Sequence, residues 1–232
     1  MILERKTQIN IPELTDQHSL LFQQFQDSEY DTGRASLMIL AELMQMYSAA
    51  MKGISTKLEV LDDEFQVIHR HNPIHHIECR IKGFSSIYQK MLRNGIPLSL
   101  DSARENIQDI AGIRVVCNFI DDVYTMETLL LKQSDVTLIQ RKDYIAQPKE
   151  TGYRSLHLVV MTPIHLSSRA EEIPVEIQLR TIAMDYWASL EHMLRYKNNG
   201  DNMEKYYAML LDCSDKLAET ENTMQFIHNK IL

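Results

Sequence analysis

The chain has 232 residues, which suits one domain with extensions, because domains commonly hold roughly 100 to 200 residues. Its residues are 44% hydrophobic and 24% charged, with only 7 glycines and 6 prolines, a composition that excludes disordered and fibrous chains. The formal net charge of -8 opposes broad binding to duplex nucleic acid through phosphate neutralisation. We therefore expect a globular, helix-rich protein in which any anionic ligand binds at a local cluster of positive charge.

The start of the chain, MILERKTQINIPELTDQ, lacks the basic region, apolar stretch and cleavage site of a secretion signal. No later run approaches the roughly 18 apolar residues of a membrane span. The cysteines Cys79, Cys117 and Cys213 lie far apart and form no CxxC pair, which predicts buried, reduced thiols. These features indicate a cytoplasmic protein without a membrane contact.

Apolar residues from Leu37 to Ile68 recur at alternating spacings of three and four, which predicts a long helix with one apolar seam. The seam would pack on the core or on a partner helix. Because about 30 residues of helix extend on the order of 45 Å, we expect this helix to reach beyond its own domain. An oligomer contact is expected there.

The sequence His71-Asn72-Pro73 ends this helix, since the residue before a proline avoids the α region. A second helix is predicted from about Ile74 to Arg93, where Asn94-Gly95-Ile96-Pro97 stops it. The elements predicted after it are a helix over 102–108, a strand over 113–117, a helix over 121–132, strands over 136–144, 156–163 and 174–181, and helices over 183–197 and from 203 onward. This order predicts a mixed α/β centre flanked by helices.

The segment RIKGFSSIYQKMLR, residues 80–93, carries four cations and no acidic residue in a chain that is acidic overall. On the predicted helix one face would carry the side chains of Lys82, Ser86, Lys90 and Arg93, with Arg80 just before them. Such a face could hold a polyphosphate. The alternative is an ordinary solvated basic face.

Two further segments place acidic groups near strands. In QDIAGIRVV, Asp109 precedes a buried strand that carries Arg114, and in VEIQLRT the period of two puts Glu176, Gln178 and Arg180 on one face. A structural ion pair and a solvent-exposed strand face are the alternatives. If both segments line one site, the two carboxylates supply the hard oxygen ligands that Mg²⁺ prefers beside substrate phosphates.

A loop with proline and glycine, in KDYIAQPKETGYRSLHLVV, offers Lys142, Lys149, Tyr153, Arg154 and His157 before a strand. Binding groups collect on loops that a rigid sheet supports. Taken alone, the tyrosine is equally a packing residue and the histidine a satisfied core residue.

Four motifs in this order resemble the small alarmone synthetases, and most nearly their RelP type: RIKGFSSIYQK, QDIAGIRVVC, KDYIAQPKETGYRSLHL and VEIQLRTIAMDYWASLEH. The resemblance spans about residues 69 to 200. It implies an α/β (α+β) fold in which helices flank a nucleotidyltransferase-like mixed β-sheet, with long N- and C-terminal helices. The implied division is an N-terminal helical segment over 1–70 with an oligomer contact, a (p)ppGpp synthetase catalytic core over 71–200 and a C-terminal helix over 201–232.

The resemblance implies a GTP/GDP diphosphokinase, which transfers pyrophosphate from ATP to the 3′-hydroxyl of GDP or GTP and releases AMP, with Mg²⁺ as cofactor. In this family pattern Asp109 and Glu176 are the metal ligands, and Glu176 is the base that takes the 3′-hydroxyl proton. Arg80 and Arg114 resemble the pair that sandwiches the adenine. The groups that would hold the ATP phosphates are Lys82, Ser86, Lys90 and Arg93.

For the guanine nucleotide, the resemblance implies that Tyr153 stacks on the base. Asp185 is the candidate acceptor for the guanine N1 and N2 protons, although an acidic residue in a first helical turn is also an ordinary helix-start feature. The expected phosphate contacts are Lys142, Lys149 and His157. The expected supporting residues are Gln178, Arg180 and Arg154.

Relatives of this kind assemble as homotetramers, and we expect the same here. The chain contains no His-Asp dipeptide, the metal signature of the hydrolase domain in long family members, so we expect synthesis without hydrolysis. One rival hypothesis is a non-catalytic module on the same fold that binds a nucleotide or single-stranded RNA, which is possible but not indicated. Another is a related transferase that releases pyrophosphate where this one would release AMP.

Overall fold

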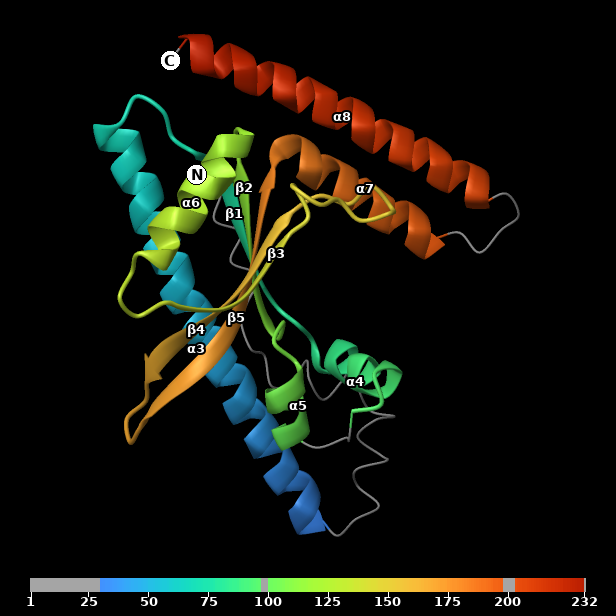
Figure 1. Ribbon diagram of the computed structural model, residues 1–232. Helices are drawn as coiled ribbons and strands as arrows, with labels where there is room; N and C mark the ends of the chain where they lie inside the picture. Colours follow the sequence, from blue (N-terminus) through green and yellow to red (C-terminus); the bar gives the residue numbers. More distant parts are fainter. Residues whose placement is uncertain (1–29, 97–99, 198–202, 232) are drawn as a thin grey trace.

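The protein is described by a computed structural model for residues 30–96, 100–197 and 203–231, and Figure 1 shows helices around a twisted sheet. The described helices are α3 (Tyr30–Ile68), α4 (Phe84–Arg93), α5 (Leu100–Asn106), α6 (Ile120–Leu131), α7 (Ile182–Lys197) and α8 (Met203–Ile231). The described strands are β1 (Ile74–Ile81), β2 (Ala111–Cys117), β3 (Thr137–Asp143), β4 (Leu156–His165) and β5 (Ala170–Thr181).

The strands form one mixed sheet in the order β1-β2-β5-β4-β3. Only the central pair, β2 and β5, is parallel, and the other neighbours are antiparallel. A parallel pair needs a long crossover, which the chain provides through α6, β3 and β4. The predicted mixed α/β sheet with flanking helices is confirmed.

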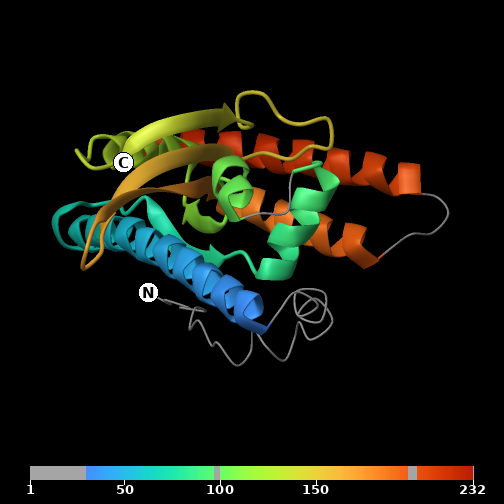
Figure 2. The same ribbon diagram turned by 90° about the horizontal axis from the view of Figure 1, so that it is seen from below.

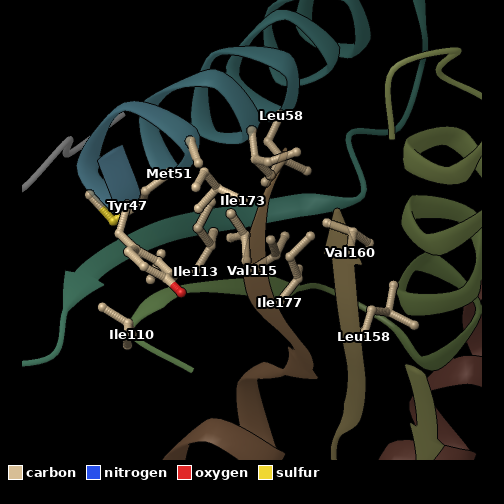
Figure 3. Close-up of a cluster of buried hydrophobic side chains, with 14 of the residues drawn as sticks. Tyr47, Met51, Leu58, Ile110, Ile113, Val115, Leu158, Val160, Ile173 and Ile177 are labelled. Carbon is tan, nitrogen blue, oxygen red and sulfur yellow. The ribbon is translucent and has the colours of Figure 1, made fainter. Parts of the chain in front are cut away.

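The hydrophobic core lies between α3 and one face of the sheet, as Figure 3 shows in close-up. On the sheet side the alternation of β5 sends Ile173, Val175, Ile177 and Leu179 into this core, and Glu176 and Gln178 to the opposite face. On the helix side the fully buried large side chains are Tyr47, Met51, Ile54 and Leu58.

The apolar seam of α3 therefore packs against the sheet of its own chain from Leu43 to Leu58, and the expectation that the seam packs on the core is confirmed for this stretch. The reason is that the inner face of the sheet carries Ile and Val side chains, which this helix covers together with Val123, Met126 and Leu130 of α6. Beyond Leu58 the helix exposes Val60, Val67 and Ile68. An oligomer contact of the N-terminal segment stays a prediction.

The predicted helix over Ile74–Arg93 is wrong in its first half, where the chain forms the edge strand β1 and only then α4. The cause is a β-bulge between Ile74 and His76 in the pairing with β2. An extra residue in one strand lets side chains three apart face the same side. Ile74 and Ile77 are consequently both buried, a spacing that imitates a helix.

The C-terminal helix α8 lies along α7 and also meets α6, as Figures 1 and 2 both show. The indole of Trp187 on α7 donates a hydrogen bond to the carbonyl of Leu210 on α8 at 2.8 Å. None of the described helices has the length and apolar character that a bilayer crossing requires.

We expect Leu58→Ala to lower the free energy of unfolding by about 2 to 5 kcal/mol, because a fully buried side chain leaves a cavity between α3 and the sheet. Val67→Ala, on the same helix but 84% exposed, should change it by less than about 0.5 kcal/mol. Urea denaturation followed by circular dichroism measures both, and equal effects would contradict the described packing.

Candidate active site

The face of the sheet opposite α3 carries a row of polar side chains, one from each strand. The register pairs Glu78 with Arg114, Arg114 with Gln178, Gln178 with His157, and His157 with Lys142. Cross-strand partners project to the same side of a sheet. The register therefore gathers residues that are up to about a hundred positions apart in the sequence into one surface.

Asp109 stands just before β2, between the fully buried Ile107 and Ile110, which fix its backbone. Its Oδ2 atom lies 2.5 Å from Lys82 Nζ and 2.8 Å from Lys90 Nζ. Burial alone would raise the pKa of Asp109, but the two lysines outweigh it and hold this pKa below its usual value. Its Oδ1 atom is buried and has no hydrogen-bond partner among the residues that the structure describes.

Glu176 lies on β5 opposite Gly112 of β2, close to Asp109. Its Oε1 atom is 3.3 Å from His157 Nδ1, and its Oε2 atom accepts a hydrogen bond from Gln178 Nε2 at 3.1 Å. Burial raises the pKa of Glu176, yet the hydrogen bond from His157 prevails and the pKa is lowered. The charge of Asp109 acts in the opposite direction, so the two carboxylates are near enough to influence one another.

A hydrogen-bonded chain connects Glu176 to the loop before β4. The Tyr153 hydroxyl lies 2.7 Å from His157 Nε2 and accepts from Arg180 Nη2 at 2.7 Å. With the proton of His157 on Nδ1, the ring donates to Glu176 and accepts from Tyr153, which satisfies both nitrogens. The chain fixes the tyrosine and the carboxylate relative to each other.

Asp185 in the first turn of α7 closes the network. Its Oδ1 atom lies 3.1 Å from Arg180 Nη1 and 3.3 Å from Arg114 Nη1. Arg114 also reaches Glu78 on β1, at 2.9 Å. Asp185 is thus an ion-pair partner of two arginines and more than a helix-start residue.

The predicted phosphate-binding cations gather at the edge of this surface, but not all on one helix. Lys82 follows β1, and only Ser86, Lys90 and Arg93 belong to α4, so the shared helical face predicted for all four is wrong. Lys82 and Lys90 still meet, because both bind Asp109. The side chains of Ser86 and Arg93 are exposed, as is that of Arg80 on β1.

On the loop side, Lys149 Nζ lies 4.5 Å from the ring centroid of Tyr144 and 4.8 Å from that of Tyr153. Tyr144 also contacts the His157 ring edge-on at 5.3 Å. Lys142 is exposed on β3. Arg154 turns away from the row and pairs with Asp215 on α8 at 3.1 Å.

Two residues of this network, Glu78 and Tyr144, were not singled out from the sequence. Glu78 stands two positions before Arg80, a strand spacing that the predicted helix obscured. Tyr144 precedes the loop with no polar motif of its own. Its proximity to Tyr153 depends on the hydrogen bond from the Tyr144 backbone N–H to the Ser155 carbonyl, at 2.9 Å.

Two paired carboxylates, bordered by cations on one side and by a tyrosine, a histidine and lysines on the other, define a class of site that binds polyanions on an α/β sheet. Comparison with known proteins makes this specific. The family described as "Region found in RelA / SpoT proteins" matches residues 79–201. GTP pyrophosphokinase YwaC of Bacillus subtilis is 40% identical over 187 residues, which cover 81% of this chain and 86% of the relative.

Solved structures agree. The small alarmone synthetase 1 of Bacillus subtilis bound to its product pppGpp has a TM-score of 0.74 at 37% identity, covering 80% of this chain and 94% of that one. A GTP pyrophosphokinase family protein of Streptococcus pneumoniae has a TM-score of 0.76 at 34% identity, covering 83% and 94%. The chain belongs to the RelA/SpoT family and is related to its small alarmone synthetases.

We expect Lys90→Met to raise the pKa of Asp109, because one of the two opposing cations is lost while burial stays. A lowered carboxyl pKa contributes stability above the unfolded pKa of about 3.9, and this contribution disappears as the pH falls through the folded value. In the variant the stability that the ionised Asp109 carboxyl contributes should be lost at a higher pH than in the wild type. Carbon-detected NMR titration of the Asp109 carboxyl measures the shift.

Lys216→Met is the matched control, since this lysine pairs with Asp212 on the exposed surface of α8. It should leave the Asp109 titration unchanged. An unaltered Asp109 pKa in Lys90→Met would contradict the conclusion that its ion pairs with Lys82 and Lys90 lower this pKa.

Proposed function

We propose that the chain is a GTP/GDP diphosphokinase that transfers the pyrophosphate of ATP to the 3′-hydroxyl of GDP or GTP and so makes the alarmones ppGpp and pppGpp. The observation that carries the proposal is the pair Asp109 and Glu176, which stand side by side with lysines on one and His157 on the other. Family membership supports the same activity, since a related synthetase binds pppGpp as its product and another structure of it holds AMPCPP.

The ATP side of the site would be the cluster around α4 and β1. In the proposal Lys82 and Lys90 leave their ion pairs with Asp109 and bind the ATP phosphates instead. Ser86 and Arg93 would be further phosphate contacts. Phosphoryl transfer depends on positioned cations more than on nucleophilic side chains, which suits this cluster. Arg80 and Arg114 lie on neighbouring strands β1 and β2, and their guanidinium planes would enclose the adenine.

A Mg²⁺ ion fits the residues present. The buried Oδ1 of Asp109 has no partner within the described part of the chain, and its neighbour Glu176 brings a second carboxylate that is held ionised. Mg²⁺ is commonly bound by one or two carboxylates together with substrate phosphates. When bound, the ion would neutralise charge on the transferring phosphates, and Asp109 and Glu176 would be its protein ligands.

The acceptor nucleotide would lie along Tyr153, His157, Lys142 of β3 and Lys149 of the β3–β4 loop. Tyr153 would stack on guanine, with its hydroxyl fixed by Arg180 and His157. Lys142, Lys149 and His157 would contact the phosphates. Asp185 would accept the guanine N1 and N2 protons, while Arg180 keeps the carboxylate in place and Arg114 leaves it for the adenine.

In the proposed reaction Glu176 takes the proton of the 3′-hydroxyl. The 3′-oxygen then forms a bond to the β-phosphorus, the bond from this phosphorus to the oxygen on the α-phosphorus breaks, and AMP leaves. The lowered pKa of Glu176 keeps it ionised near neutral pH, so it is ready to accept. His157, hydrogen-bonded to Glu176, would orient the base and stabilise its ionised form, while Tyr153 holds the imidazole ring in place.

Product analysis tests the activity. With ATP and GDP, anion exchange should show AMP and a 3′-pyrophosphorylated guanine nucleotide. Release of pyrophosphate would instead identify another transferase, and the absence of turnover a binding module. Glu176→Gln should lower kcat by roughly 10² to 10⁴, the usual contribution of a general base, with nucleotides still bound.

Glu172→Gln is the matched control, because Glu172 lies on the same strand with an exposed side chain. It should retain wild-type kcat. A near-native kcat in Glu176→Gln would refute the assignment of the base.

We also propose a homotetramer in the cytoplasm. The support is the number of large apolar side chains exposed on the two C-terminal helices, among them Tyr186, Met193, Met209 and Phe226. Where exposed apolar side chains gather into one patch, they commonly mark an interface. Light scattering at micromolar concentration should give a mass larger than that of a dimer, and a monomer would contradict this.

A further inference from the structure

The loop between β3 and β4, residues 144–155, carries Tyr153 and makes a tight turn of its own. The Gly152 N–H donates to the Lys149 carbonyl at 2.8 Å, and the Lys149 N–H donates to the Tyr153 carbonyl at 3.1 Å. Gly152 has φ +88°, a left-handed conformation that favours glycine. This turn sets the direction in which Tyr153 leaves the backbone.

The turn does not stand alone, because α8 touches its backbone directly. Ser214 Oγ on α8 donates a hydrogen bond to the Gly152 carbonyl at 2.6 Å, and Ser214 is only 4% exposed. A Cβ atom on Gly152 would lie 2.9 Å from Ser214 Cβ and 3.2 Å from Leu211 Cδ1. Glycine is therefore required both by the turn and by the close approach of the helix.

The next residue of α8 holds the other side of Tyr153. Asp215 pairs with Arg154 at 3.1 Å, although its carboxylate is 60% exposed and the pair is consequently the weaker contact. Consecutive residues of α8 thus hold the two chain neighbours of Tyr153, Gly152 and Arg154. The β3–β4 loop, drawn in yellow, and α8, drawn in red, lie near each other in both Figures 1 and 2, in agreement with the hydrogen bond between Ser214 and Gly152.

The helix that holds the loop is itself fixed at several places. Thr181 at the end of β5 donates a hydrogen bond to Glu221 of α8. Near the C-terminal end the His228 ring stacks on Phe119 with centroids 4.1 Å apart, and Gln225 donates to Asp121 at 3.0 Å. With the Trp187 contact to Leu210, these interactions attach α8 to α7, β5 and α6.

We propose that α8 is a positioning element for the acceptor nucleotide: Ser214, assisted by Asp215, holds the turn at Gly152 so that Tyr153 faces the site. The inference rests on the proposed function, in which Tyr153 stacks on guanine. Ser214 and Asp215 touch no substrate in this scheme, and they act through the loop. Loss of the contact between Ser214 and Gly152 should weaken the binding of the guanine nucleotide more than that of ATP. The reason is that the proposed ATP contacts Lys82 and Lys90 do not touch Ser214 among the described residues.

The test compares the full-length wild type with Ser214→Ala and Asp215→Asn by two measurements. In steady-state kinetics Ser214→Ala should raise the KM for GDP by roughly 3- to 10-fold, the effect of one lost hydrogen bond, with the KM for ATP and kcat changed less than about twofold. Asp215→Asn should act in the same direction and more weakly. In hydrogen exchange, the loop peptide over residues 144–155 should exchange faster in Ser214→Ala.

Thr220→Ala is the matched control, a hydroxyl removed from the exposed side of the same helix, where it only bonds its own backbone at Lys216. Tyr153→Ala is the reference for a lost guanine contact. Unchanged loop exchange in Ser214→Ala, equal changes of both KM values, or the same effect in Thr220→Ala would overturn the proposal. If the wild type makes no AMP from ATP and GDP, the proposed function fails, and loop exchange still decides whether α8 holds the turn.

Discussion

The parallel pairing of β2 with β5 is the constraint on which the rest of this structure depends. It sets Glu176 opposite Gly112, three residues after Asp109, and so brings together two carboxylates that are 67 positions apart in the chain. The antiparallel strands on either side extend the same polar face, with Glu78 on β1 and His157 on β4. A one-residue slip of β5 would send Glu176 into the core and Ile177 to the polar face.

Two half-buried carboxylates so close together require compensation, and the site provides it from different elements. Lys82 and Lys90 neutralise Asp109, and His157 with Gln178 satisfies Glu176. Each compensating group is also a proposed substrate contact or its immediate neighbour. This network keeps both carboxylates ionised, and in the proposed function nucleotides and a cation would replace part of it.

Much of this site could be predicted from the sequence, since period two on β5 correctly gave one face to Glu176, Gln178 and Arg180. The order of helices and strands after residue 100 was also predicted. The strand β1 was not predicted, because its bulge buries two apolar residues three positions apart, which is the spacing of a helix. Nor could the contact of Ser214 with Gly152 be predicted, since it joins positions 62 apart and depends on how α8 lies on α7. The ion pairs of Asp185 were missed for the same reason.

In the proposed function Asp109 and Glu176 act together on one divalent cation beside the nucleotide phosphates. Electron paramagnetic resonance of Mn²⁺ bound with a non-hydrolysable ATP analogue tests it most directly, using the wild type, Asp109→Asn, Glu176→Gln and the double variant. Each single change should weaken Mn²⁺ binding by roughly tenfold or more. In the double variant the loss of binding free energy should be smaller than the sum of the losses in the two single variants, because the two ligands share one ion. Wild-type Mn²⁺ affinity in either single variant would contradict it.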